Sequence, residues 1–207
     1  DINASQYSKV CPIRSPEGPN IGLVTYMALY SRVNHLGFLE APYRNVEKVI
    51  VKGNTRMRVT DQVDYLQADD EENFHITHAE IPITQDGFID AEWVPIRYQR
   101  SFTEGPATDV DYMDVVSRQA VGTSANLIPF LAHDEASRAL MGTHMQCQAV
   151  PLVKTEAPVV GTGMEETVIR EMRRAVFAKE AGVVTAVDAN KIEISGKKET
   201  ITYTVQK

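Results

Sequence analysis

Arg138 is the residue of this chain best suited to bind an anion, and it lies in a predicted helix within residues 133–151. Its guanidinium is a planar fork of donors that matches phosphate oxygens and stays protonated even when partly dehydrated. With about 3.6 residues per turn, the helix places four further residues on the same face: Met141, Gly142, Met145 and Gln148. A glycine inside a helix costs roughly 1 kcal/mol relative to alanine, so Gly142 predicts a close approach by a backbone or a ligand. The pattern indicates a charged helix face in a narrow, packed place.

Arg138 also has a plainer interpretation. Asp134 lies four residues before it, a spacing at which a helix brings opposite charges together. Such an exposed pair would stabilise the helix by roughly 0.3–0.5 kcal/mol and do nothing else. Spacing alone leaves both interpretations open.

A loop rich in proline and glycine, SPEGPNIG at residues 15–22, is the second candidate site. Pro16 and Pro19 restrict its backbone, while Glu17 and Asn20 are able to point outward. This composition is typical of an ordered binding loop, and equally of a turn that only connects two elements.

Other patterns carry less chemistry. His75 and His78 follow the acidic run at residues 69–72, but residues three apart in a strand point to opposite faces, so we reject a metal site there. The GTG turn at residues 161–163 is a weak phosphate-binding signal. A helix predicted at residues 164–179 carries three arginines that we interpret as a solvated face: Arg170, Arg173 and Arg174.

The net charge of −7 argues against a nucleic-acid ligand until its distribution is considered. Residues 59–96 hold ten acidic residues and neither Lys nor Arg, whereas residues 1–58 hold eight basic and four acidic ones. The acidic residues are therefore concentrated in one segment, and the basic N-terminal part could bind a polyanion.

Cys11 and Cys147 are far apart and in no metal-ligand spacing, so we predict neither a disulfide scaffold nor a zinc site, and expect both thiols to be reduced and buried. No apolar run approaches the roughly 20 residues that span a bilayer, and no secretory signal is present. We expect a cytoplasmic protein. A start at Asp1 and a strand-like end at Lys207 lead us to expect a piece of something longer.

The predicted elements give an α+β fold class, a β-rich, mixed, multi-segment chain in which short helices flank an antiparallel β module. Asn20 can cap a helix that ends near Gly37. Short β-branched or aromatic runs then predict four strands, at residues 46–51, 57–66, 74–83 and 89–98, with a hairpin turn at 85–87. After these we predict a strand at 113–117, a short helix at 125–133 interrupted at Pro129, the two helices above, and strands at 182–187, 191–194 and 200–205.

Five motifs resemble, in the same order, the β subunit of bacterial DNA-directed RNA polymerase. They are CPIRSPEGPNIGL (11–23), GFLEAPYR (37–44), VDYMDV (110–115), LIPFLAHDEASRALMGTHMQCQAVP (127–151) and VGTGME (160–165). The resemblance covers essentially the whole chain and is weakest in the acidic β-rich region. It implies three segments: the end of the fork region with its PEGPN loop and helix (1–40), an external β-rich acidic module (41–110), and the beginning of a hybrid-binding region, truncated at its C-terminus (111–207).

The resemblance implies template-directed RNA synthesis from nucleoside triphosphates by nucleotidyl transfer. Arg138 then contacts the phosphates of the incoming triphosphate and stabilises charge on the departing pyrophosphate. The other implied roles are support of Arg138 by Asp134 and Glu135, proximity to RNA or the RNA–DNA hybrid for Gln148, Glu17 and Asn20, and a rifamycin-pocket-like surface at Pro16, Asn20 and Val24.

The resemblance also implies partners and a cofactor. The Mg²⁺ ions of the assembled enzyme are held chiefly by the other large subunit, and none is bound by this chain alone. The implied partners are the β′, α, ω and sigma subunits, the DNA template, the RNA transcript and nucleoside triphosphates, without a membrane. We expect the chain alone to be inactive.

Four residues depart from the family's usual ones. Arg14-Ser15 stands where Glu-Thr is usual, His144 where Asn is usual, and Cys147 where Arg is usual. Loss of a cation at Cys147 would weaken an RNA or hybrid contact, and Arg14 would alter drug binding near the loop. The alternative function is a non-catalytic, nucleic-acid-binding β-rich module whose basic N-terminal part contacts phosphates.

Overall fold

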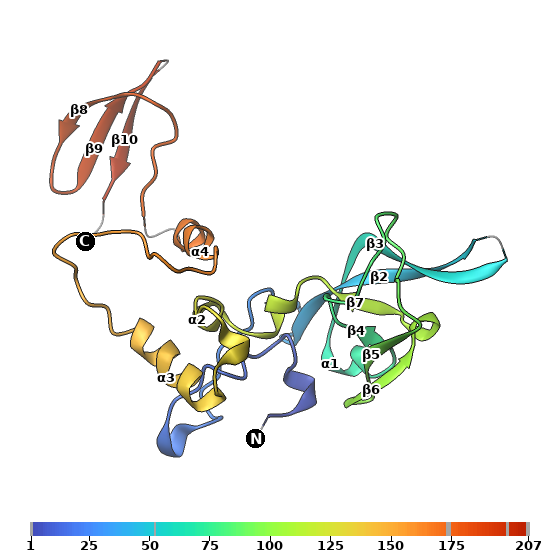
Figure 1. Ribbon diagram of the computed structural model, residues 1–207. Coiled ribbons are helices and arrows are strands. Elements are labelled where there is room, and N and C mark those ends of the chain that lie inside the picture. Colours follow the sequence, from blue (N-terminus) through green and yellow to red (C-terminus); the bar gives the residue numbers. More distant parts are fainter. Residues whose placement is uncertain (1, 52, 173–174, 198, 206–207) are drawn as a thin grey trace. The chain divides into compact units, whose positions relative to one another are not determined.

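The computed structural model describes residues 2–51, 53–172, 175–197 and 199–205 (Figure 1). The chain divides into two compact units, Asp1–Thr162 and Gly163–Lys207. Strands and a few short helices make up both, which confirms the predicted α+β class. Among the helices that the structure describes, none is both long and apolar enough to cross a membrane.

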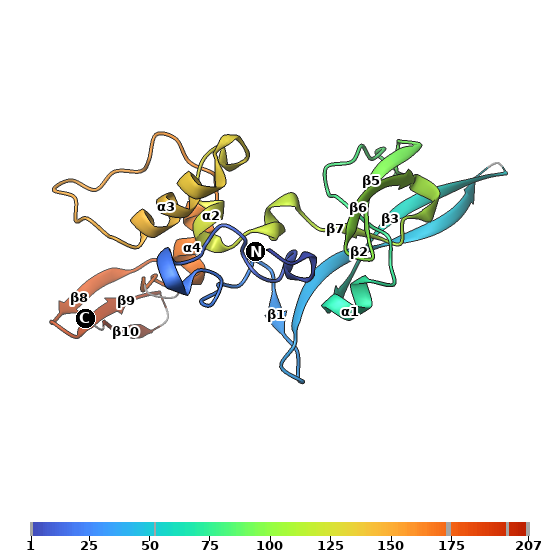
Figure 2. The ribbon, with the colours of Figure 1, turned by 90° about the horizontal axis from the view of Figure 1, so that it is seen from below.

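The sheet of the first unit is built on one long antiparallel ribbon, β2 (Leu39–Val51) and β3 (Asn54–Leu66), which is bulged between Arg44 and Val46. The ribbon is seen from a second side in Figure 2. One end of β2 pairs with β1 (Arg32–Val33), and its middle pairs with β7 (Tyr112–Asp114). The order then continues through β4 (Ile76–Thr77), β5 (Trp93–Tyr98) and β6 (Ser101–Pro106). Pairing is antiparallel except between β4 and β7.

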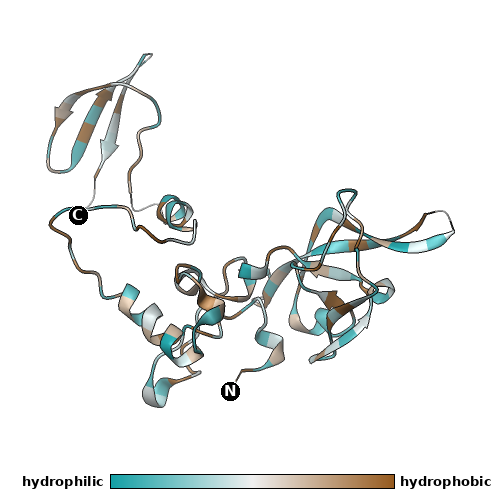
Figure 3. Cartoon of the chain, in the orientation of Figure 1, coloured by the Kyte–Doolittle hydropathy of each residue, from teal (hydrophilic) through white to brown (hydrophobic). Residues whose placement is uncertain are grey.

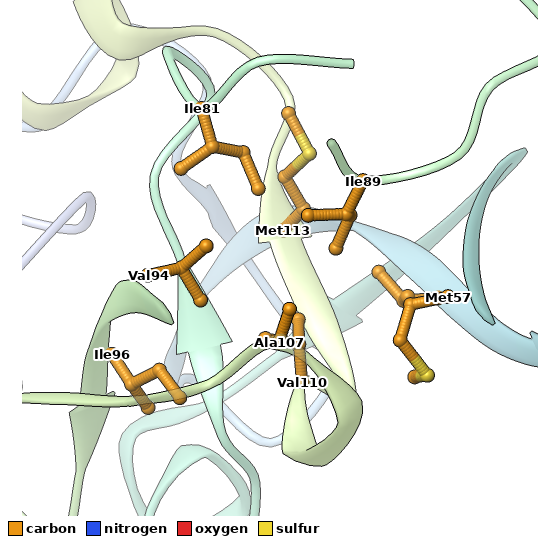
Figure 4. Packing of buried hydrophobic residues seen from close by; sticks show 9 residues of the cluster. Met57, Ile81, Ile89, Val94, Ile96, Ala107, Val110 and Met113 are labelled. Atoms are coloured by element: carbon orange, nitrogen blue, oxygen red, sulfur yellow. The ribbon is translucent and has the colours of Figure 1, made fainter. Parts of the chain in front are cut away.

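The main hydrophobic core lies inside this β module. Along β5, Val94 and Ile96 are buried while Trp93 and Pro95 are exposed, as the two-residue period of a strand requires. Figure 4 shows these inward side chains meeting residues of other strands and loops. The cluster contains Val46, Met57, Ile81, Ile89, Val94, Ile96, Ala107, Val110 and Met113. A second cluster contains Ala41, Tyr43, Leu66 and Ile76.

The helix predicted from Asn20 to Gly37 is wrong. The segment holds a single 3-10 turn, Gly18–Asn20, then a bridge between Val10 and Met27 and the short strand β1. Gly18 and Gly22 have φ of +86° and +75°, a left-handed conformation that interrupts α-helical hydrogen bonding. The apparent apolar stripe has no core to face, and Leu23 is 78% exposed.

Three strand predictions were too long, and two strands, β1 and β6, were missed. Of residues 74–83 only β4 is a strand, because Pro82 and the following turn interrupt pairing. Of the strand predicted at 89–98, only the part that forms β5 is a strand. The strand predicted at 113–117 overlaps β7 only in its first residues, since a 3-10 turn begins at Ser117. The predicted turn at 85–87 is present, with Gly87 donating to the Thr84 carbonyl at 2.9 Å.

Short helices connect the sheet to the rest of the first unit. α1 (Ala68–Glu71) overlaps the acidic run at residues 69–72. α2 (Thr123–Asn126) and a 3-10 turn (Leu131–His133) are separated around Pro129, as predicted. α3 (Ala136–Gln146) is the predicted helix of Arg138.

The second unit contains one helix and a three-stranded antiparallel sheet among its described residues. The helix α4 (Glu165–Glu171) is shorter than the predicted 164–179, and part of that prediction falls on residues 173–174, outside the described residues. The predicted strands are confirmed as β8 (Val183–Val187), β9 (Lys191–Ser195) and β10 (Thr200–Thr204), with β9 in the middle. Figure 3 shows the alternation of hydrophilic and hydrophobic residues along β9.

Candidate functional site

α3 presents Arg138 on an exposed face. The buried residues of this helix are Ala139 and Thr143, so the packed face is the one that Arg138 does not share. Met141 and Met145, which do share it, are 40% and 63% exposed. The expectation that Arg138 enters a packed, narrow place is therefore wrong for this chain taken by itself.

The Arg138 guanidinium carries no ion pair within the described part of the chain. Its Nη1 lies 3.7 Å from the Sδ atom of Met141, and no contact with Asp134 is formed. Glu135, at the N-cap, accepts a hydrogen bond from the Ser137 hydroxyl at 2.7 Å. The surface-pair interpretation is thus not supported, and the guanidinium fork is available to an anion.

Gly142 does not mark a close approach within the chain. A methyl group at this position would lie 3.6 Å from Cδ1 of Ile128, which is an ordinary van der Waals contact. Gly122, at the N-cap of α2, does need its small size, because a methyl group there would lie 3.0 Å from the Met27 carbonyl oxygen.

We expect Gly142→Ala to stabilise the chain by up to about 1 kcal/mol, because alanine favours the helix and its methyl group fits. The urea midpoint of unfolding measures this change. Gly122→Ala is the matched control and should lower the midpoint, since the Met27 carbonyl cannot easily move. A destabilised Gly142→Ala chain would contradict the packing described for α3.

The PEGPN loop is ordered by its own contacts. Glu17 precedes the 3-10 turn Gly18–Asn20 with an extended backbone, and Pro19 lies in the first turn. The Gly22 N–H donates to Ser15 Oγ at 3.2 Å, which closes the loop. As predicted, Glu17 and Asn20 are exposed; Val24 is exposed too, and Pro16 is half-buried.

The structure brings this loop against α3. A hollow of about 230 Å³ is lined by Ser15, Ile21 and Gly22 of the loop, by Val24 and Thr25 just after it, by residues of the N-terminal segment, and by Leu140 of α3. Arg14 also lines it and bridges the two elements: its Nη1 donates to the Thr143 carbonyl at 2.8 Å. The two candidate sites of the sequence are therefore one neighbourhood.

Gln148, His144 and Cys147 lie at the C-terminal end of α3. Gln148 is exposed and its N–H donates to the Met145 carbonyl at 3.0 Å, and His144 is half-buried. Cys147 is exposed, which corrects the expectation that both cysteines are buried; only Cys11 is. The helix ends before Cys147, so this side chain is not packed among the turns of α3.

A buried polar cluster, which we call the Glu71 cluster, was missed by the sequence analysis. Glu71 is 5% exposed, forms ion pairs with Lys9 and with Arg97 at 2.7 Å, and accepts from the Tyr43 hydroxyl at 2.8 Å. The cluster joins the N-terminal segment to the β module. Burial lowers the pKa of Lys9, and burial raises the pKa of Tyr43.

Asp114 extends this cluster on the side of β7. It accepts from the Tyr7 hydroxyl at 2.7 Å, and its Oδ1 has no hydrogen-bond partner among the described residues. Burial raises the pKa of this carboxyl. The sequence analysis missed the Glu71 cluster because Glu71 belongs to an acidic run that resembles a solvated loop.

The two histidines have separate partners. His75 stacks on Tyr98 with ring centroids 4.2 Å apart and lies 3.3 Å from Asp111. His78 lies 3.8 Å from Asp114. In the part of the chain that the structure describes, no group of three His, Cys, Asp or Glu could hold a metal ion.

The C-terminal candidates are weaker still. The helix that follows residues 161–163 has only seven residues. Arg170 pairs with Glu166 at 2.6 Å on an exposed face, as predicted for a solvated helix. Arg173 and Arg174 lie outside the described residues.

Two family models match parts of this chain, and both describe RNA polymerase subunits. The family models that match are the RNA polymerase beta subunit external 1 domain, over residues 43–116, and RNA polymerase Rpb2, domain 3, over residues 1–33. The domain limits predicted at residues 40 and 110 stay a prediction.

Similar curated proteins carry the name DNA-directed RNA polymerase subunit beta. That of Syntrophomonas wolfei is 45% identical over 97% of this chain and 18% of its own length. The protein of Methylacidiphilum infernorum is 46% identical over 94% of this chain and 14% of its own length. The protein of Renibacterium salmoninarum is 50% identical over 92% of this chain and 16% of its own length. The chain thus spans less than a fifth of the length of these relatives.

Proposed function

The chain belongs to the family of bacterial DNA-directed RNA polymerase β subunits, and we therefore propose that it takes part in template-directed RNA synthesis by nucleotidyl transfer. The observation that carries the proposal is the Arg138 guanidinium, exposed on α3 and without an ion-pair partner among the described residues. The similarity to these β subunits, at 45–50% identity, extends over at least 92% of the chain and so is not confined to the β module. This extent favours a polymerase segment over an independent nucleic-acid-binding module.

Arg138 contacts the triphosphate in this proposal. Two parallel N–H donors match two phosphate oxygens, and no carboxylate has to be displaced before they bind. Negative charge that develops on the departing pyrophosphate is stabilised by a cation that is already in place. Asp134 and Glu135 lie four and three residues before Arg138 in sequence, and we assign them a supporting role; the Glu135 carboxylate accepts from the Ser137 hydroxyl.

RNA and hybrid contacts are assigned to Glu17, Asn20 and Gln148. All three side chains are exposed; Glu17 and Asn20 belong to the loop, and Gln148 follows the end of α3. Of the three residues assigned to a rifamycin-pocket-like surface, Pro16, Asn20 and Val24, Val24 lines the hollow of about 230 Å³, which supports a small-molecule surface there.

Partners and metal ions complete the proposal. Exposed apolar side chains such as Leu23, Leu152 and Val159 support burial against other parts of an assembled polymerase with β′, α, ω and sigma subunits, template and transcript. The proposal keeps the Mg²⁺ ions of the assembled enzyme chiefly on the other large subunit, as the resemblance implies. We assign the assembly to the cytoplasm.

Site-specific photo-crosslinking tests the proposal. A photoreactive benzoylphenylalanine replaces Met141, on the face of Arg138, in a polymerase whose β subunit contains this segment. We expect crosslinking to a radiolabelled nucleoside triphosphate complementary to the next template base, and little with a non-complementary one. The matched control is Ala136, which is exposed on the opposite side of α3. Equal labelling from both positions, or from neither, would contradict the proposed orientation.

A further inference from the structure

Arg14 touches three segments of the first unit at once. Its Nη1 donates to the Thr143 carbonyl of α3 at 2.8 Å and lies 3.4 Å from the Ser124 hydroxyl of α2. The guanidinium carbon lies 4.6 Å from the centre of the Tyr26 ring, in a cation–π contact. A single planar group therefore holds both helices against the segment that contains the PEGPN loop.

The contact with Thr143 satisfies a carbonyl that the helix itself leaves open. The last carbonyls of a helix have no partner within it. At this end the Cys147 N–H donates to the His144 carbonyl at 3.0 Å, three residues back, and so does not serve Thr143. Thr143 is fully buried, so water cannot easily replace the missing donor. A cation near a helix C-terminus is also favoured by the helix dipole.

The backbone of Arg14, next to the PEGPN loop, is also held in place. The backbone N–H of Arg14 donates to Sγ of the buried Cys11 at 3.3 Å. Gly122 approaches Cys11 so closely that an added methyl group would lie 3.1 Å from its Cβ. Arg14 is thus anchored through its backbone at one end and through its guanidinium at the other.

We propose that Arg14 is a positioning residue that caps α3 from the PEGPN loop and thereby holds Arg138 at a set place relative to that loop. Arg138 lies five residues before Thr143 on the same helix, which is about 7.5 Å along the axis. A small tilt or shift of the helix end moves the Arg138 guanidinium relative to Glu17 and Asn20. The inference rests on the proposed function of Arg138.

A double-mutant cycle tests this inference in an assembled polymerase whose β subunit contains this segment. The measured quantity is kcat/KM for addition of a single complementary nucleotide. Arg14→Ala should lower it about threefold to thirtyfold, because a displaced group loses alignment with the substrate. In the Arg138→Ala background the same change should have almost no further effect, because it acts through Arg138.

Two further variants keep the test sharp. Arg14→Lys keeps the charge but loses the planar fork, so we expect partial rescue relative to alanine, and it replaces the alanine variant in the cycle if the latter does not assemble. Arg118→Ala removes an exposed arginine of the first unit, whereas Arg14 is half-buried, and should leave kcat/KM unchanged.

The outcomes separate this inference from the proposed function. Additive effects of Arg14 and Arg138, or an Arg14→Ala enzyme with normal kcat/KM, would overturn the positioning role alone. An Arg138→Ala enzyme with normal kcat/KM would overturn the proposed phosphate contact, and with it the premise.

Discussion

Replacing Arg138 by alanine is expected to lower kcat/KM for nucleotide addition by about tenfold to a thousandfold, the usual range for one lost charge-assisted contact to a transition state. The side chain is exposed, so the chain should fold and the polymerase should assemble as before. Single-nucleotide addition across a range of triphosphate concentrations measures the effect. Arg138→Lys should be intermediate, because lysine keeps the charge but cannot bind two oxygens in a fork.

Arg170→Ala is the control for this prediction. Arg170 is also an exposed helical arginine, but its charge is paired with Glu166 at 2.6 Å, and no nucleotide contact is assigned to it. We expect no change in kcat/KM. An unchanged rate for Arg138→Ala, with assembly and template binding intact, would remove Arg138 from the phosphate site.

Glu71→Gln is expected to destabilise the first unit by about 3–5 kcal/mol, the cost of breaking a buried ion pair by removing one partner. Glutamine has the same shape, but it removes the direct ion-pair partner of the buried cations of Lys9 and Arg97, which are 3% and 8% exposed. Urea unfolding of the chain measures the loss as a lower midpoint.

Glu72→Gln is the matched control, one residue away. Its carboxylate pairs with Arg100 at an exposed position, where ion pairs contribute about 0–1 kcal/mol. The two variants have the same chemistry and neighbouring positions, and differ in burial. Equal destabilisation by both would mean that the Glu71 cluster does not stabilise the junction between the N-terminal segment and the β module.

Local patterns predicted the elements whose signals are local. α3 follows from good helix formers between acidic residues and a proline, and the closing strands follow from alternation between turn residues. The prediction of a helix from Asn20 to Gly37 failed because the apolar spacing resembles that of a helix, while Gly18 and Gly22 take left-handed backbone conformations that interrupt α-helical hydrogen bonding.

Arg138 could be chosen from its residue type and position, and motif order was enough to identify the family. Arg14 and Glu71 could not be chosen in this way. Arg14 meets Thr143 across 129 positions of sequence, and Glu71 meets Lys9 across 62. Such contacts depend on chain reversals far from either residue, and a charged residue that ends up buried looks the same in sequence as one that stays in water.

The sequence by itself determined the α+β class, the helix of Arg138, the rigid loop and the family, because each depends on local propensity or on motif order. Only the tertiary structure decided that the loop and α3 form one neighbourhood, that Arg138 faces outward, and that buried charges join the N-terminal segment to the β module. The physical reason is that burial and pairing are properties of the packed chain, in which distant residues exclude water from one another.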